Sequence, residues 1–441
     1  MSLKLSAQYL DILADADVVV AGSGAAGVAA AIQAARMKKS VVLLDKNNCA
    51  GGILTSGMLP SIIHMSDGKN LLSSGLCKEL CDNTAKRMNV PVNYNWFNIN
   101  TEAVKIVLDE MLAAAGVKVI YNVHIVQAML KRRKIDALAV MTVKGMMAVT
   151  GKVFIDATGD GLLSVLAGAP FEYGDAVTGE VMAPTLCSNF TNINYEALAP
   201  EMRNRGLGRE EWKNARESGE KLHMQEGHFV GHFRNSMTGG TGNLGHIYHT
   251  DTLDPISLSN ASTEGRKQAW GFLDFFRTHV KGFENAELSA TASLLGVRES
   301  RRIVGEYMLT RSDYLERKHF SDDIGCFAYA IDIHSGTSDV KKQAAVESNL
   351  TKSYYEAGEN YGIPYRALLP KNTTNLLVAG RCISTDRAMQ ASIRIVPGCM
   401  ITGQAAGTAA ALSVESGKSL RKISIKKLQS ILRNNNCFLP Q

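Results

Sequence analysis

The chain has 441 residues, of which 45% are hydrophobic and 20% are charged, and its formal net charge is +6. This balance is typical of a globular protein of two or three domains, and it excludes collagen-like and intrinsically disordered chains. The excess of basic residues is too small to call for a nucleic-acid partner.

A strand, a tight turn and a helix are predicted over 18–31, VVVAGSGAAGVAAA. The β-branched start is typical of a short buried parallel strand. Gly22, Gly24 and Gly27 then match the dinucleotide fingerprint G-x-G-x-x-G. The first glycine permits the turn, the second lets backbone N–H groups approach a pyrophosphate, and the third lets helix and strand pack closely. The positive end of the helix dipole would stabilise a diphosphate there. A glycine-rich loop of another α/β fold is the alternative.

A second strand, SVVLLDK (40–46), supplies the acid that this fingerprint needs about 20 residues further on. Asp45 ends the apolar run, where a carboxylate can accept hydrogen bonds from a ribose and would repel the 2′-phosphate of NADP. The choice between NAD and FAD stays open on these residues. A glycine-rich loop, NNCAGGILTSGM (47–58), follows and is expected to return toward the first helix.

Helices and a meander are predicted next. Residues 75–88 and 101–116 are predicted helices, the second of them clearly amphipathic. A third strand at 117–123 and an antiparallel meander at 124–155 follow. The meander ends in KVFIDATGDG (152–161), a strand that runs into small residues able to approach a ligand closely.

The middle of the chain, from 180 to 365, has weaker periodicity and more turns, and we expect a mixed α+β domain there. Its GTGNLG (240–245) also spells the fingerprint, but no apolar strand precedes it, so no second dinucleotide site is predicted. The first pattern then returns, with NLLVAGRC (375–382) as a strand into glycine and 397–417 as a small-residue helix. The nucleotide-binding domain is therefore expected to be split around the middle domain.

Taken in this order, the motifs resemble the FAD-binding fold of the glutathione-reductase and fumarate-reductase flavoproteins. YGIPYRALLP (361–370), NLLVAGRCIS (375–384), GVRESRRIVGEYMLT (296–310) and GQAAGTAAAL (403–412) resemble a narrower set, the bacterial FAD-dependent oxidoreductases of poorly defined substrate. The resemblance covers most of the chain and is weakest over 60–98 and 185–285.

The resemblance implies an α/β fold in which a Rossmann-like FAD-binding domain of glutathione-reductase type is split in sequence into 1–184 and 366–441. An α+β substrate domain would be inserted at 185–365, and the implied cofactor is FAD.

The resemblance also assigns residues to FAD. The fingerprint turn would cradle the diphosphate, Asp45 would hold the adenosine ribose, and the helix that begins near Gly398 would direct its N–H groups at flavin N1 and C2=O. Arg381 stands where relatives place an acid that touches the ribityl chain, so its role is open, with a phosphate contact as the alternative. The implied set is Gly22, Ser23, Gly24, Ala25, Ala26, Gly27, Asp45, Lys46, Gly51, Gly52, Val123, Ala157, Thr158, Gly159, Gly380, Arg381, Gly398 and Cys399.

The candidate catalytic residues are cationic or titratable. Arg298 and Arg302 are four residues apart and could clamp a substrate carboxylate, with a structural ion-pair network to Glu299 and Glu306 as the alternative. Arg394 precedes the small-residue helix and is expected near the flavin ring.

His246 is a candidate proton donor, against the alternative of a structural histidine. His64 is considered as a covalent flavin attachment point, on a poor local match. The middle-domain histidines lack ligand spacing, so no metal site is predicted.

These residues predict an FAD-dependent oxidoreductase that transfers a hydride between flavin N5 and a small organic substrate, such as a carboxylate. The electron acceptor is unknown. One alternative is a reductase driven by pyridine nucleotide, which would need a second dinucleotide motif. Another is a nucleic-acid-binding flavoprotein of tRNA-modifying type, supported only by LKRRK (130–134) and RKISIKK (421–427), which are more simply solvated faces. We therefore expect no nucleic-acid partner, and a homo-oligomer stays open.

The eight cysteines and the N-terminal region favour the cytoplasm. The cysteine spacing is irregular and contains no C-x-x-C, so neither an iron–sulfur cluster nor a zinc ribbon is predicted. Asp11, Asp15 and Asp17 occupy the place of the apolar region of a secretory signal. Residues 18–35 and 399–414 are uncharged but resemble buried segments of a soluble fold, so no membrane span is expected.

Overall fold

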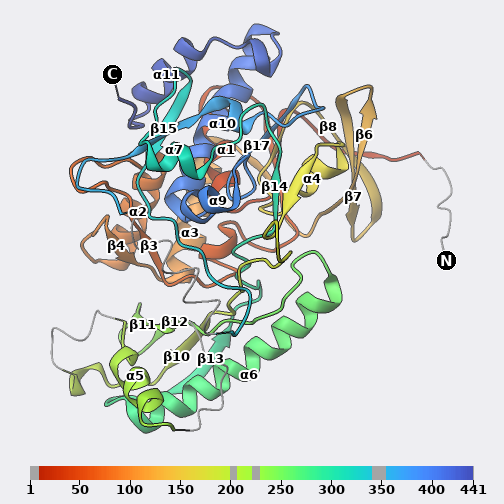
Figure 1. Ribbon diagram of the computed structural model, residues 1–441. Helices are drawn as coiled ribbons and strands as arrows, with labels where there is room; N and C mark the ends of the chain where they lie inside the picture. Colours follow the sequence, from red (N-terminus) through yellow and green to blue (C-terminus); the bar gives the residue numbers. More distant parts are fainter. Residues whose placement is uncertain (1–8, 199–205, 221–228, 340–353, 441) are drawn as a thin grey trace.

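In the computed structural model, residues 9–198, 206–220, 229–339 and 354–440 are described. A seven-stranded sheet, which includes the antiparallel meander, packs against helices, and a separate four-stranded sheet with a long helix lies below it in Figure 1.

The large sheet has the strand order β5 (Lys118–Ile120), β2 (Val41–Leu44), β1 (Ile12–Ala21), β8 (Gly145–Asp156), β7 (Lys134–Thr142) and β6 (His124–Lys131). Strand β1 runs parallel to both β2 and β8, and β2 runs parallel to β5. The late strand β17 (Leu376–Val378) also pairs in parallel with β8, with Val378 opposite Asp156. The sheet is Rossmann-like, and it joins the early and late parts of the chain.

Both faces of β1 are buried, which explains its continuous apolar run. Val18 and Val20 belong to the core that α1 and α10 share, whereas Val19 packs in a second core with Ile135 and Leu138 of the meander. Strand β7 is antiparallel to both of its neighbours, β6 and β8, so the three strands form the meander that the sequence predicts.

Helices α1 (Ala25–Arg36) and α10 (Val396–Ser416) pack tightly together. A Cβ on Gly403 would lie 2.1 Å from the carbonyl oxygen of Ala26, and one on Gly407 would lie 2.2 Å from that of Ala30. The small residues of α10 are therefore required by the close approach of the two backbones. The late helix thus packs directly against the helix that follows the early glycine turn.

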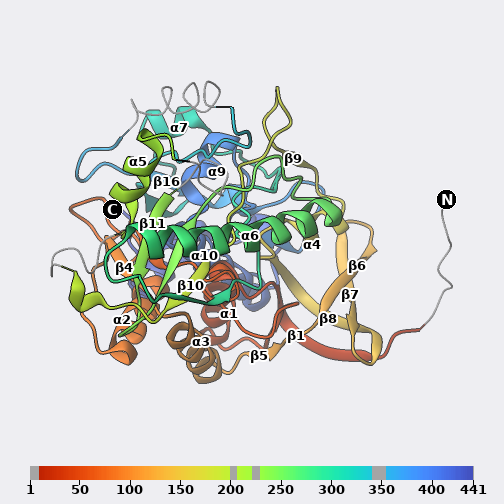
Figure 2. The same ribbon diagram turned by 90° about the horizontal axis from the view of Figure 1, so that it is seen from below.

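The second sheet is antiparallel, with the order β11 (Phe229–Arg234), β12 (Gly240–Leu244), β10 (Ser188–Thr191) and β13 (Glu287–Thr291). Helix α6 (Pro255–His279) covers its outer face, in the foreground of Figure 2. An aromatic core that includes Phe190, Phe276 and Trp212 of α5 (Arg209–Glu217) holds the two together. The GTGNLG segment forms β12 rather than a strand–turn–helix, in agreement with its rejection as a dinucleotide site.

The packing differs from the predicted division at 365. Side chains between 303 and 365, among them Tyr314, Phe327 and Tyr361, are fully buried in the core of α1 and α10. The aromatic core of the second sheet draws instead on residues between 190 and 286. The weak periodicity after 296 hid this return to the first core, because short strands and turns carry the buried aromatic residues there.

Shorter elements complete the part of the chain that the structure describes. They are η1 (Gly52–Leu54), β3 (Ser61–Ile63), α2 (Leu76–Met88), β4 (Trp96–Asn98), α3 (Thr101–Ala115), α4 (Leu162–Leu166), β9 (Phe171–Tyr173), η2 (Tyr195–Ala197), β14 (Arg301–Ile303), α7 (Arg311–Leu315), β15 (Asp323–Phe327), β16 (Tyr361–Pro364), η4 (Tyr365–Leu368), α9 (Arg387–Ile393), η5 (Leu420–Lys422) and α11 (Ile425–Asn434). Within the described ranges no single helix has the length and apolarity of a membrane span, and only α9 and α10 taken together, bent by 92°, do so.

Candidate functional site

A cavity of about 620 Å³ lies at the carboxyl ends of β1, β2, β8 and β17. The amino ends of α1 and α10 line it, and residues of the second sheet, such as Phe233 and Asn243, also contribute to its wall. A volume of this size is ordinary for a cofactor or ligand pocket, and the carboxyl edge of a parallel sheet is where α/β folds bind ligands.

The three fingerprint glycines have distinct geometric roles. Gly22 has a φ of +92°, and a Cβ there would lie 2.5 Å from the carbonyl oxygen of Ala157. A Cβ on Gly27 would lie 1.8 Å from the carbonyl oxygen of Gly22. A Cβ on Gly24 meets nothing within 4 Å, and Gly24 lines the cavity at the start of α1 without a side-chain cap. Gly22 and Gly27 thus serve the turn, and Gly24 leaves room for a ligand.

Asp45 ties the second strand to this turn. Its Oδ2 accepts hydrogen bonds from the Ser23 backbone N–H at 2.5 Å and from the Ser23 hydroxyl at 2.7 Å. Its Oδ1 accepts two from Asn47, at 2.8 and 2.9 Å. Asp45, Lys46 and Val123 line the cavity. The carboxylate therefore helps to fix the loop while its edge stays at the cavity wall.

Several predicted cofactor residues support the wall from behind. The Gly51 N–H donates to the Ser23 carbonyl at 2.7 Å, next to Gly52, which lines the cavity. A Cβ on Gly398 would lie 2.4 Å from the Ile393 carbonyl oxygen, so Gly398 packs inward. Ser23, Gly27, Gly51 and Gly398 are absent from the described lining, which includes Ala25, Ala26, Ala157, Thr158, Gly159, Gly380 and Cys399 from the predicted set.

Arg381 is engaged by the protein itself. Its Nε donates to the carbonyl of Gly159 at 2.7 Å, and its other two nitrogens bond to the Val297 carbonyl and to the Asp160 carboxylate. The guanidinium thus joins the ends of β8 and β17 to the segment that returns from the second sheet. The predicted alternative of a phosphate contact is not supported by this geometry.

The second helix end is open toward the cavity. Ile395, Val396 and Cys399 line it, and the N-cap of α10 has no side-chain hydrogen bond. A helix of 21 residues presents the positive end of its dipole there. Two uncapped helix ends and the space left by Gly24 fit a long anionic cofactor such as FAD.

Two arginines, Arg298 and Arg394, also line this cavity. Arg298 is 9% exposed, and it donates to the carbonyl of Ala183 at 2.6 Å and to the hydroxyl of Thr185 at 2.9 Å. Arg394 donates to the Asp332 backbone at 3.0 Å and to its carboxylate at 3.1 Å. Burial, with a contribution from Arg394, lowers the pKa of Arg298 to about 10, so Arg298 stays charged at neutral pH.

A chain of hydrogen bonds starts at Asp332. His334 Nε2 lies 3.0 Å from Asp332 Oδ2, His334 Nδ1 lies 3.0 Å from His246 Nε2, and His246 Nδ1 lies 3.4 Å from the Tyr248 hydroxyl. Burial alone would raise the pKa of Asp332, but His334, Arg394 and Arg298 hold it well below its usual value. The carboxylate is therefore ionised and only accepts hydrogen bonds.

The ionised Asp332 fixes the tautomer of each histidine in turn. His334 must donate from Nε2, so its Nδ1 accepts from His246, whose own Nδ1 then accepts from Tyr248. Burial lowers the pKa of His334 to about 4 and that of His246 further, so both rings are neutral. Tyr329, which donates to Asp332 Oδ2 at 3.1 Å, lines the cavity with Asp332 and His334, whereas His246 stands behind them.

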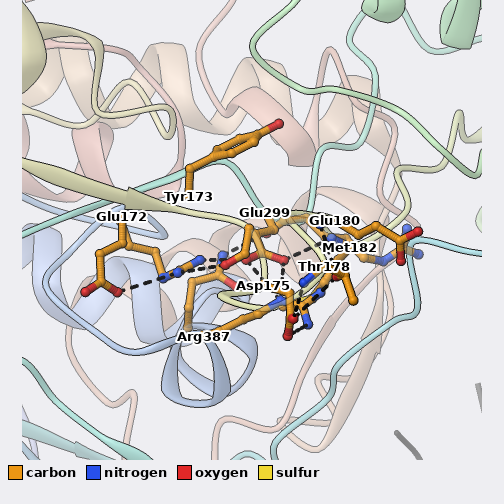
Figure 3. A network of polar contacts seen from close by, with 12 residues as sticks. Glu172, Tyr173, Asp175, Thr178, Glu180, Met182, Glu299 and Arg387 are labelled. Carbon is orange, nitrogen blue, oxygen red and sulfur yellow. Dashed lines mark hydrogen bonds and ion pairs between the residues drawn. The ribbon is translucent and has the colours of Figure 1, made fainter. Parts of the chain in front are cut away.

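Arg302 belongs to a buried ion-pair network. Its guanidinium lies 2.6 Å from Glu299, which is 0% exposed, and 3.6 Å from Glu172. Glu299 also pairs with Arg387 at 3.0 Å, and Arg387 pairs with Asp175 at 3.1 Å, as Figure 3 shows. This network connects β14 and α9 to the segment after β9.

The structure does not bring Arg298 and Arg302 together at the cavity, and Arg302 takes part in the ion-pair network that was the alternative to a carboxylate clamp. Arg302 is absent from the described cavity lining, because β14 begins only at Arg301 and the residues before it follow no regular helix or strand. Arg394 takes the position beside Arg298 instead. Of the two acids in the alternative ion-pair network, Glu299 does pair with Arg302. Glu306 pairs instead with Arg421, at 2.8 Å.

Sequence reasoning missed Asp332 and Tyr329, and it noted His334 only as one of several histidines. All three lie in YAIDIHSGT (329–337), which follows β15 and has no periodic pattern. The pair of acid and histidine two residues apart was the available signal. His64 also lines the cavity, with its ring centroid 4.9 Å from that of Tyr329.

A family model described as FAD dependent oxidoreductase matches residues 17–432, nearly the whole chain. Among curated proteins, the mitochondrial dihydrolipoyl dehydrogenase of Macaca fascicularis is 42% identical over 77 residues, 15% of this chain and 15% of that protein. Dihydrolipoyl dehydrogenase 3 of Haloarcula marismortui is 27% identical over 110 residues, 25% of this chain and 23% of that protein. The chain thus aligns with less than a quarter of the length of either relative.

Two of the solved structures that a structural comparison returns have TM-scores just under 0.5. A geranylgeranyl bacteriochlorophyll reductase-like protein of Thermoplasma acidophilum has a TM-score of 0.47 and 12% identity, over 96% of this chain and 84% of that one. The flavin-dependent brominase Bmp2 has a TM-score of 0.48 and 12% identity, over 95% of this chain and 84% of that one. Neither likeness bears on the substrate.

Proposed function

Because the chain belongs to the family of FAD-dependent oxidoreductases, we propose that it transfers a hydride between FAD and a small organic substrate that carries a carboxylate. Arg298 and Arg394 would bind that carboxylate. The observation that carries the proposal is the charge of the cavity wall that they line, where the buried guanidinium of Arg298 and the largely buried one of Arg394 lie with the ionised carboxylate of Asp332 and the neutral ring of His334. A surplus positive charge out of water favours an anionic ligand.

The chain contributes position and electrostatics, while bound FAD supplies the hydride chemistry at its ring. Residues at the first turn of α10, such as Cys399, support the ring side of the cofactor, where the helix dipole would favour the reduced, more negative state. Arg298, held by the Ala183 carbonyl and the Thr185 hydroxyl, would orient the substrate against it.

The histidine chain would position the substrate end of the cavity. In the tautomers that Asp332 imposes, each donor points from Tyr248 through His246 and His334 toward the Asp332 carboxylate. These bonds would hold Asp332, and through it the guanidinium of Arg394, in place beside the substrate.

An anaerobic screen tests the proposal. The holoprotein is mixed with small hydroxy acids and amino acids, each beside its methyl ester, and flavin absorbance is followed. Bleaching by an acid and at least tenfold slower bleaching by its ester are expected, because loss of a charged partner costs about 1.5–3 kcal/mol. Equal rates for acid and ester would overturn the carboxylate assignment.

A further inference from the structure

A mixed cluster of His319, Asp323 and Cys326 lies outside the cavity, and we propose that it binds a divalent transition-metal ion, with zinc as the best match. The three ligand atoms lie within 4.8 Å of one another. His319 Nδ1 is 3.1 Å from Asp323 Oδ2 and 4.0 Å from Cys326 Sγ. Tetrahedral zinc holds such nitrogen, oxygen and sulfur atoms roughly 3.3–3.6 Å apart, so a small adjustment suffices.

The fold brings the three residues together. Asp323 and Cys326 lie on β15, and His319 precedes that strand in the connection from α7. The register of β15 on β16 shifts between Asp323 and Cys326. A Cβ on Gly362 of β16 would lie 2.1 Å from Asp323 Oδ2, so a glycine is needed to seat the carboxylate.

Two buried oxygen atoms beside the cluster lack donors. Asp323 is 5% exposed, and its Oδ1 has no hydrogen-bond partner within the described part of the chain. The same holds for Oδ1 of Asn360, whose backbone bonds the His319 ring. Unsatisfied buried acceptors call for a cation or water, and a backbone bond to the second ring nitrogen is the usual support of a metal-bound histidine.

The surroundings are negatively charged. The Asp67 carboxylate accepts bonds from Lys69, Asn70 and Asn360, and it adds to the field at Cys326. An ordinary His–Asp ion pair would account for His319 and one oxygen of Asp323, but not for the nearby thiol or for the second oxygen. Sulfur and nitrogen ligands favour zinc over magnesium or calcium.

The side chain of His319 is 41% exposed and gives an ion a route from solvent. This proposal departs from the expectation that the histidines in the middle of the chain bind no metal, because the cluster joins His319 to an acid and a thiol on a strand that only the fold defines. The site is independent of the proposed hydride transfer.

The test uses the full FAD-bound chain, freed of metal with a chelator and then titrated with ZnCl₂ against a chromophoric competitor. One equivalent of tightly bound zinc is expected. Loss of a residue that only supports a metal ligand typically weakens metal binding about 10- to 100-fold. Cys326→Ser and His319→Gln each remove a ligand itself and should weaken zinc binding by more than that. Cys437→Ser and His249→Gln are matched controls, a thiol and an exposed histidine elsewhere, and should bind zinc as the parent does.

Cobalt binding gives a second readout that does not depend on the variants. Co²⁺ in the parent should show intense tetrahedral d–d bands at longer wavelengths than the flavin absorbs. Absence of stoichiometric zinc binding, weak octahedral cobalt bands, or unchanged affinity in both ligand variants would each overturn the assignment.

Discussion

Gly403 of α10 lies against Ala26 of α1 so closely that a Cβ on Gly403 would stand 2.1 Å from the Ala26 carbonyl oxygen. This contact joins two segments that are far apart in the sequence, and it sets the distance between the two helix ends that line the cavity. The position of α10, and with it the ring side of the FAD site that we propose, therefore depends on a residue without a side chain.

Gly403→Val should separate the two helices and reduce both stability and FAD retention. Overpacking a tight interface typically costs about 1–3 kcal/mol. The measurements are the thermal midpoint and the flavin content of the purified chain. Glu415→Val, at the exposed end of the same helix, is the control and should change stability by less than about 0.5 kcal/mol. Full flavin content in Gly403→Val would contradict the packing argument.

Gly24 and Gly27 should respond differently to alanine. Gly24→Ala places a methyl group in open space at the cavity, so the FAD-free chain should keep its thermal midpoint while FAD affinity falls at least tenfold. Gly27→Ala places the methyl group 1.8 Å from a carbonyl oxygen and should destabilise the chain itself. Similar behaviour of the two variants would show that Gly24 does not face the cofactor.

Arg298→Met and Arg302→Met should separate substrate binding from structure. Arg298→Met should keep flavin bound while the KM for an acidic substrate rises about 10- to 100-fold. Arg302→Met leaves the fully buried Glu299 with one partner fewer and should cost about 3–5 kcal/mol of stability. The checks are steady-state kinetics and denaturant unfolding. The opposite result, in which Arg302→Met raises the KM and Arg298→Met lowers the stability, would instead support a role for Arg302 in the carboxylate clamp that was considered from the sequence.

Stability should fall in mild acid because of the buried histidines. The folded pKa of His334 is about 4 and that of His232 about 3, both lowered by burial, whereas a free histidine titrates near 6.5. The unfolded chain therefore binds more protons between pH 6.5 and 4, and stability rises with pH across that window and levels off above it. In His334→Gln, the total change in the free energy of unfolding between pH 4 and pH 6.5 should be smaller than in the parent by up to about 3 kcal/mol.

Exposed His249 supplies the control for this measurement, and His249→Gln should keep the parental slope. Thermal midpoints at half-unit pH steps give the comparison. A His334→Gln slope equal to the parental one would mean that the His334 ring is protonated in the fold and that the inferred tautomers are wrong.

The elements that the sequence predicts well are those whose pattern is strong over many residues. The run from Val18 to Gly27 identifies a buried strand, a turn and a helix, because parallel strands are apolar on both faces and a nucleotide turn needs glycine. The small residues of α10 likewise indicate a close helix–helix contact. These features depend on short-range constraints that leave a mark on composition.

Other features depend on tertiary packing. Tyr314 and Phe327 join the core of α1 from a segment of short strands and turns. The hydrophobic residues of that segment follow neither the two-residue repeat of a strand nor the 3.6-residue repeat of a helix. Arg298 and Arg302 point to different surroundings because the backbone between them is irregular. Asp332 and His334 meet Arg394 only through the fold, so spacing in the sequence could not pair them.

A crystal structure of the yellow holoprotein tests the central claim most directly. The account predicts one FAD per chain in the cavity, with the diphosphate beside Gly24 and the isoalloxazine ring at the first turn of α10 near Cys399. Flavin bound anywhere else, or with its ring remote from residues 395–399, would contradict it.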